Sequence, residues 1–220
     1  MDSVKEYGQE VITTEKGYKI GIVTIIGEIE GHTLLAANAK TTKYEHIIPL
    51  LIGMENDSSI DGILFVLNTI GGDVECGLAI AEMIAAIQKP TVSLVIGGSH
   101  SIGIPLAVAT DCSFIVPSAT MLAHPVRMNG TVLGAPQTYY QFNQMQERII
   151  GFICRHAAIE KVRLEELMLA KDTMAKDLGT ILVGEKAVKE GLISQVGDLG
   201  DAMQTLERKI SGKKKKQNGA

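Results

Sequence analysis

The sequence contains no tryptophan, and aromatic residues make up only 4% of its 220 residues. No apolar run reaches the roughly 18 residues that cross a bilayer, and the first twenty residues lack the basic start and apolar middle of a secretory signal. We therefore expect a cytoplasmic protein without an integral membrane segment. Three cysteines, Cys76, Cys112 and Cys154, form no CxxC pair, which argues against a disulfide framework or a zinc site. We expect no metal and no cofactor.

Positive charge is concentrated at the end of the chain. The net charge is −4, and the last ten residues, 211–220, carry four lysines and no acid, which leaves −8 on the rest. An acidic body argues against a nucleic-acid function. The lysine run could contact anionic lipid or nucleic acid, but its short length and polar context favour a solvated, disordered tail. We expect one domain over residues 1–210.

Apolar runs and helical patterns alternate along the chain, which is typical of an α/β fold. The expected helix after residue 73 is capped by Asp73 and stopped by Pro90. The β-branched runs at 61–67 and 91–96 flank it, so the three form a βαβ unit. The other expected strands are 18–26, 112–116, 119–123 and 192–196, and the other expected helices are 136–158, 164–170 and 185–189.

The expected helix at 136–158 has a broad apolar face that needs a partner. That face comprises Tyr139, Phe142, Met145, Ile149, Phe152 and Ile153.

Two junctions between a strand and a helix could carry chemistry, because ligands bind at the carboxyl ends of strands in α/β sheets. At the first, Gly71 and Gly72 can turn sharply and leave amides free to bind an oxyanion. A plain turn is the competing reading. At the second, Ser101 follows the strand at 91–96 and precedes an apolar run, where it could be a nucleophile or only a helix cap.

A nucleophilic serine needs a base and a group that orients the base. His124 follows a short strand, and Asp172 follows an expected helix. Taken singly, each has an ordinary structural reading: a packed histidine and a solvated or capping aspartate.

Together these pieces resemble the ClpP family of serine peptidases, most closely its TepA-like branch. The resemblance rests on NTIGGDVECGLAI, SHSIG, PSATMLAH and LAKDT, and spans about residues 18–200. It implies a ClpP/crotonase-like spiral of βαβ units with a protruding handle helix. It further implies Ser101 as nucleophile, His124 as general base and Asp172 as its orienting group.

The resemblance also implies which residues bind the substrate. The amides of Gly72 and Ile102 would form the oxyanion hole. Gly71, Val126, Arg127 and Met128 would contact the substrate, as an extended peptide pairs with the backbone of 125–133.

The family pattern implies an assembly as well. Residues 125–158 would join two seven-membered rings, or complete one, around a chamber that admits peptides and unfolded proteins. An AAA+ unfoldase is the family's partner, but the first twenty residues do not resemble the axial loop segment, which counts against docking.

Two rival functions remain open. One is a crotonase-like acyl-CoA enzyme, which would need a carboxylate base at the site. The other is a ring-forming scaffold that assists protein translocation or quality control without catalysis.

Overall fold

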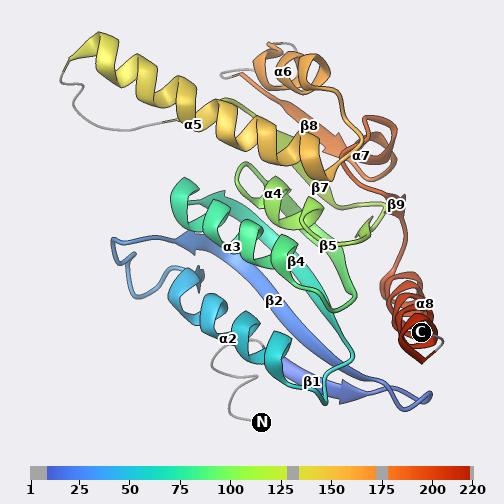
Figure 1. Cartoon of the computed structure of the whole chain (residues 1–220). Helices are drawn as coiled ribbons and strands as arrows, with labels where there is room; N and C mark the ends of the chain where they lie inside the picture. The colour runs from blue at the N-terminus through green and yellow to red at the C-terminus, as the bar shows by residue number, and fades with distance from the viewer. Residues whose placement is uncertain (1–8, 128–133, 172–177, 219–220) are drawn as a thin grey trace.

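The protein has an α/β fold in a computed structural model that describes residues 9–127, 134–171 and 178–218 (Figure 1). The strands are β1 (Gln9–Thr13), β2 (Lys19–Glu30), β3 (Thr41–Lys43), β4 (Gly62–Gly72), β5 (Thr91–His100), β6 (Ser113–Ile115), β7 (Thr120–Ala123), β8 (Thr180–Val183) and β9 (Gln195–Val196). The helices are α2 (Tyr44–Asn56), α3 (Val74–Ala86), α4 (Gly103–Val108), α5 (Ala135–His156), α6 (Lys161–Leu169), α7 (Glu185–Lys189) and α8 (Leu199–Asn218). The predicted α/β class is confirmed.

The strands form one sheet whose main path is β1-β2-β4-β5-β6-β9. Strands β2, β4 and β5 are parallel neighbours, and α3 connects β4 to β5 as the predicted βαβ unit. Strand β5 changes neighbour along its length, because Ser93–Val95 pair with β6 and Gly98–His100 pair with β7. The carboxyl ends of β4, β5 and β7 therefore lie side by side.

Apolar side chains fill both faces of the sheet, since successive residues of a strand point to opposite sides. On β4, Ile63 and Phe65 belong to the larger core cluster, which includes buried residues of α2, α3 and α4. Leu64 belongs to a second cluster, to which α8 contributes Ala202, Leu206 and Ile210. Helix α8 therefore covers part of the face opposite α2 and α3.

The sequence predicts the start of α3 correctly. Asp73 is its N-cap, and the Asp73 carboxylate accepts a hydrogen bond from Cys76 N at 2.9 Å. Such a cap satisfies one of the amides that a helix leaves unbonded at its start. The strands before and after α3 are longer than expected: β4 continues through Gly72 and β5 through His100.

The C-terminal segment differs from the solvated tail expected from residue 211, because α8 continues through Asn218. Lys214 Nζ forms an ion pair with Asp61 at 2.6 Å and lies 5.1 Å from the centre of the Tyr18 ring. Lys213 Nζ donates to the carbonyl of Gln88. These contacts attach lysines of the run to the body of the protein.

Helix α5 begins far from the rest of the molecule (Figure 1). Its last two turns are anchored in the core by Ile149, Ile150, Phe152 and Ile153. Near its start, Tyr139 is 74% exposed. The expected apolar face is therefore covered only in its second half.

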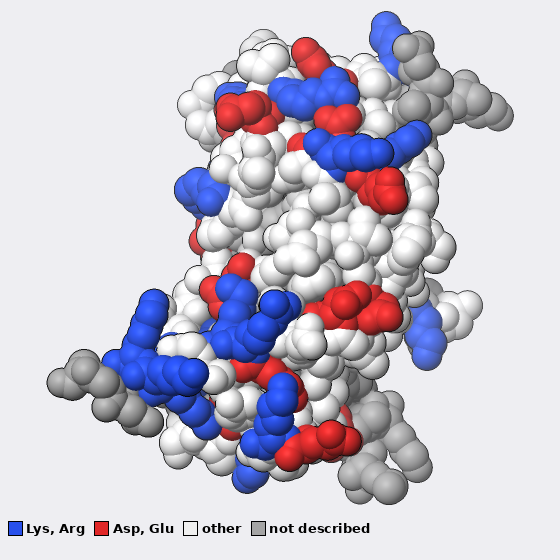
Figure 2. Space-filling view, turned by 90° about the vertical axis from the view of Figure 1, so that its right-hand side faces the viewer, with Lys and Arg blue, Asp and Glu red and all other residues white. Residues whose placement is uncertain are grey.

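Charged side chains are unevenly spread over the face shown in Figure 2. Charged side chains of both signs gather toward the two ends, with more lysine and arginine at the lower one, and a band with few charged side chains crosses the middle. Within the described ranges, no helix is long and apolar enough to cross a membrane.

Candidate active site

The candidate residues follow three neighbouring strands. Thr69 of β4 pairs with Ser99 of β5, and His100 pairs with Leu122 of β7. Gly72 ends β4, Ser101 directly follows β5 and His124 directly follows β7. Parallel strands whose carboxyl ends align thus bring together groups that lie 29 and 23 positions apart in the sequence.

Ser101 has a strained backbone. Its φ is 55°, and among the residues that the structure describes it is the only one other than glycine with positive φ. This conformation costs about 1–3 kcal/mol outside glycine and concentrates at functional sites. The turn is held by hydrogen bonds from Ser101 N to Leu122 O at 2.9 Å and from Ile104 N to Ser101 O at 3.0 Å.

The structure does not support a capping role for Ser101. The N-cap of α4 is Ile102, and no side chain caps this helix. Because Ile102 is the cap residue, its N–H is among the amides that the helix does not bond internally. Ser101 therefore presents its hydroxyl beside an amide available to a ligand.

Gly71 and Gly72 leave no space for a side chain. A Cβ on Gly71, at φ +90°, would lie 2.9 Å from Ser101 Cβ, and one on Gly72 would lie 2.3 Å from Ile29 O. Both distances are shorter than real Cβ atoms show. Glycine is required here because the end of β4 touches both β2 and the serine turn.

Ser99 supports the turn, although the sequence gives no reason to select it. Its side chain is fully buried, and its Oγ donates to Gly103 O at 2.7 Å, across Ser101. On β4, Thr69 Oγ1 donates to Gly27 O at 2.6 Å and accepts from Gly71 N at 3.1 Å. Strand pairing of Thr69 with Ser99 is the signal that would have identified both residues.

His124 has a defined tautomer. Its Nδ1 lies 2.7 Å from the carbonyl oxygen of Pro125. A carbonyl only accepts hydrogen bonds, so Nδ1 carries the proton and the lone pair of the neutral ring is on Nε2. This is the tautomer that a general base acting through Nε2 requires.

One cavity of about 170 Å³ joins these groups. It is lined by Gly72, Val74, Ser101, Ile102, Ile104, Ala123, His124, Val126, Arg127, Ile149 and Met168. Of the predicted site residues, Gly72, Ser101, Ile102, His124, Val126 and Arg127 thus share one cavity, and Gly71 adjoins Ser101. Asp172 and Met128 lie outside the described residues.

A second histidine lies near the first. Burial lowers the pKa of His100, and repulsion from His124 lowers it further. Its Nε2 lies 2.8 Å from Thr120 Oγ1. Because two charged imidazoles repel one another, the proximity of His124 favours the neutral form of His100.

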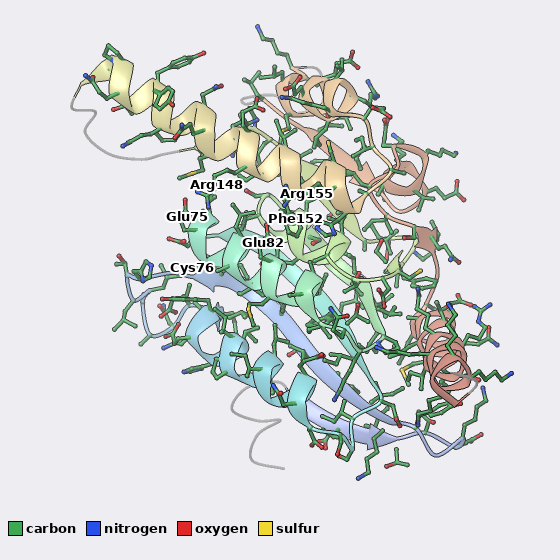
Figure 3. All side chains as sticks on the ribbon, viewed as in Figure 1. Glu75, Cys76, Glu82, Arg148, Phe152 and Arg155 are labelled. Carbon is green, nitrogen blue, oxygen red and sulfur yellow. The ribbon has the colours of Figure 1, made fainter. Side chains whose placement is uncertain are left out.

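Two ion pairs fix α5 against α3 beside the cavity (Figure 3). Arg148 donates twice to Glu75, at 2.6 and 2.9 Å, and Arg155 donates to Glu82 at 3.1 Å. Glu75 and Glu82 are seven residues apart on α3, as are Arg148 and Arg155 on α5, and seven residues make about two helical turns. Ile149, which follows Arg148, is thereby held in the cavity wall.

The buried thiol of Cys76, next to Glu75 at the start of α3, is disfavoured as a thiolate. Burial and the Asp73 carboxylate raise its pKa to about 12. Across the described part of the chain, no group of three or more His, Cys, Asp and Glu could hold a metal ion.

The fold and the cavity place the molecule among α/β proteins with a serine and a histidine at adjacent strand ends. The chain belongs to the Clp protease family, whose sequence model, described as Clp protease, matches residues 21–199. This confirms the predicted family.

Several curated proteins are similar. Translocation-enhancing protein TepA of Halalkalibacterium halodurans is 48% identical over 210 residues, which cover 96% of this chain and 82% of that protein. ATP-dependent Clp protease proteolytic subunit 2 of Treponema denticola is 28% identical over 167 residues, 74% of this chain and 80% of that protein. The corresponding subunit 1 of Protochlamydia amoebophila is 29% identical over 145 residues, 61% and 64% of the two chains.

Proposed function

We propose that the chain is a serine endopeptidase that hydrolyses peptide bonds of short or unfolded peptides through Ser101, His124 and Asp172. The observation that carries this proposal is the shared cavity, which is lined by the strained Ser101, the Nδ1-protonated His124 and the glycine turn of β4. Membership in a protease family supports the same reaction.

Each group has one site of action in the proposed chemistry, and His124 acts in turn as base and as acid. His124 Nε2 takes the proton of Ser101 Oγ as the oxygen attacks the peptide carbonyl, and later gives that proton to the leaving amine. The amides of Gly72 and Ile102 stabilise the oxyanion, each by about 3 kcal/mol. Water then hydrolyses the acyl-enzyme with His124 again as base.

Asp172 is proposed to orient and stabilise the His124 imidazolium. The described ends of its segment support this role, because Gly179 N donates to Ala170 O at 2.9 Å. A Cβ on Gly179 would lie 2.9 Å from His124 Cβ.

The cavity favours one apolar side chain of a peptide. Its walls include Val126, Ile149 and Met168, and its volume is about 170 Å³. Pockets for whole small ligands hold about 300–1,000 Å³. The described lining offers a serine and a histidine, Ser101 and His124, which supports nucleophilic catalysis over the carboxylate-based chemistry of a crotonase-like acyl-CoA enzyme.

We further propose a ring-shaped homo-oligomer, heptameric and in one or two layers. The uncovered first half of α5 supports such contacts, since exposed apolar surface marks interaction sites. The family match begins at residue 21, so the first twenty residues add no support for an AAA+ unfoldase partner. A chamber inside such a ring would admit short or unfolded chains. We propose that these substrates are cytoplasmic.

A scaffold that assists translocation is the second candidate. It is favoured by the 48% identity to a protein named for enhancing translocation. In this case the fold and its assembly would matter and the Ser101 hydroxyl would not.

Labelling with a fluorophosphonate tests the proposal, together with cleavage of a fluorogenic peptide with an apolar residue before the scissile bond. The parent is expected to be labelled on Ser101 and to cleave the peptide, and Ser101→Ala is expected to do neither. Ser118→Ala, at an exposed turn, is the matched control and should behave as the parent.

Two results would contradict the proposal. One is a parent that is neither labelled nor active as an intact assembly. The other is a Ser101→Ala chain that retains peptide cleavage. A Ser101→Ala chain that fully replaces the parent in cells would favour the scaffold.

A further inference from the structure

One peptide group in the cavity wall is held at both ends. The carbonyl of Pro125 accepts from His124 Nδ1 at 2.7 Å. The N–H of the same amide, on Val126, donates to Gln146 Oε1 at 2.9 Å. Because a peptide unit is planar, these two hydrogen bonds together set the orientation of the carbonyl that faces His124.

Gln146 is itself fixed in place. It belongs to α5, is half-buried, and its Nε2 donates to Met168 Sδ of α6 at 3.2 Å. Val126 and Met168 both line the cavity beside Ser101. The Gln146 carboxamide therefore connects α5, α6 and the segment after β7 at one point.

We propose that Gln146 is a positioning residue for His124, an inference that rests on the proposed peptidase function. Gln146 holds the Pro125–Val126 amide so that its carbonyl binds the Nδ1 proton and the Nε2 lone pair is available to Ser101. Hydrogen bonds in such a chain also polarise one another through the shared amide.

Loss of the Gln146 acceptor has a specific consequence. The Val126 N–H would be left without its partner in a half-buried site, and the amide would turn to find another. Its carbonyl would then leave Nδ1, which removes one of the two acceptors proposed for that proton and raises the share of imidazole protonated on Nε2, a form that cannot act as the base. The effect should appear in the chemical step and not in peptide binding.

Two substitutions separate this role from packing. Gln146→Met keeps an unbranched side chain of similar length but replaces the amide oxygen by a weak acceptor. Gln146→Glu keeps a strong acceptor at the same atom. Gln195→Met is the control, because Gln195 is exposed on β9, away from α5, and its Nε2 also lies near a sulfur atom, Cys112 Sγ, at 3.9 Å.

The experiment measures kcat and KM for a fluorogenic peptide, the rate of fluorophosphonate labelling at Ser101, and thermal unfolding, all on the intact assembly. For Gln146→Met we expect kcat and the labelling rate to fall about tenfold or more, with KM within about twofold of the parent. Gln146→Glu and Gln195→Met should stay within about threefold of the parent.

The outcomes distinguish a failure of the role proposed for Gln146 from a failure of the proposed peptidase function. A labelled, active parent with an unchanged Gln146→Met overturns the role of Gln146 alone, as does a Gln146→Glu chain that fails like Gln146→Met. A parent without labelling or cleavage overturns the proposed function and this inference with it. If Gln146→Met does not fold, Gln146→Ala replaces it as the variant without an acceptor, under the same expectations.

Discussion

At the scale of single residues, His124 already has an acceptor for its Nδ1 proton, the carbonyl of Pro125. In serine peptidases where only an aspartate sets the histidine tautomer, replacing that aspartate by asparagine lowers kcat by about 10⁴. For Asp172→Asn we expect a smaller loss, of about 10², since the carbonyl still favours the correct tautomer. The rates of peptide cleavage by the parent, Asp172→Asn and Ser101→Ala measure this loss. A loss as deep as that of Ser101→Ala would contradict this expectation.

Gly71 is expected to tolerate no side chain. Gly71→Ala would place a Cβ at φ +90°, 2.8 Å from His100 O and 2.9 Å from Ser101 Cβ. We expect a loss of about 2–4 kcal/mol in the free energy of unfolding and slower labelling of Ser101. Chemical denaturation and fluorophosphonate labelling measure the two effects.

Gly53→Ala is the matched control for Gly71→Ala. Gly53 lies in α2, and no atom lies within 4 Å of the position that its Cβ would take. Alanine should stabilise a helix here by about 0.5–1 kcal/mol. Equal effects of the two substitutions would show that the close packing at Gly71 is not what requires glycine.

The sequence identifies the residues that follow strands but not those that support them from elsewhere. Ser101 and the two glycines stand out because each follows an apolar run, and Asp73 because a cap precedes a helical pattern. Gln146 binds Val126, twenty positions away, through a single side-chain atom. No spacing rule predicts such a contact, because it depends on how α5 crosses the segment after β7.

At the scale of helices and strands, the ion pairs between α3 and α5 make a modest contribution. Glu75 and Arg148 are each about half exposed, 50% and 53%. Exposed pairs are worth up to about 1 kcal/mol. In a double-mutant cycle of Glu75→Gln and Arg148→Gln, we expect a coupling of about 0.5 kcal/mol in unfolding free energy. Glu82 and Arg155 form one hydrogen bond instead of two, so we expect a smaller coupling energy for that pair.

The same pair predicts a pH dependence. The hydrogen bonds from Arg148 hold the pKa of Glu75 below its ordinary value of 4.5, against the opposing effect of burial. The coupling should therefore be complete above pH 4.5 and decline as the pH falls through the lower pKa that Glu75 has in the folded protein. Unfolding of the four chains of the cycle at several pH values measures it. A coupling that grows on acidification would contradict this assignment.

The sequence places His46 on a helix but does not give the bounds of α2, and it does not predict α8, for different reasons. The buried residues of α2, Ile47, Leu51 and Met54, do follow helical spacing, but Pro49 lies inside the helix and obscures the pattern. In α8, a Gly and four lysines favour a solvated end, whereas contacts with Asp61 and Tyr18 attach Lys214 to the body. Local composition cannot report contacts made across the fold.

At the scale of the whole molecule, the uncovered start of α5 predicts an interface. Tyr139 is 74% exposed and Tyr140 61%, and a partner would bury them. A charge at Tyr139 should weaken the assembly, so Tyr139→Glu is expected to give a smaller native mass than the parent. Ser118→Glu adds the same charge at an exposed turn outside α5 and should leave the mass unchanged. Equal masses for all three chains would argue against contacts through this half of α5.

The two halves of the candidate site are built differently. Gly72, Ser101 and Ile102 stand at the ends of hydrogen-bonded strands, whereas the orientation of His124 depends on side chains from α5 and α6. Any event that separates these two helices, such as a ligand bound between them, would therefore change the orientation of His124, the proposed base, and leave Ser101, the proposed nucleophile, in place. Control of this protein is easier to impose on its histidine than on its serine.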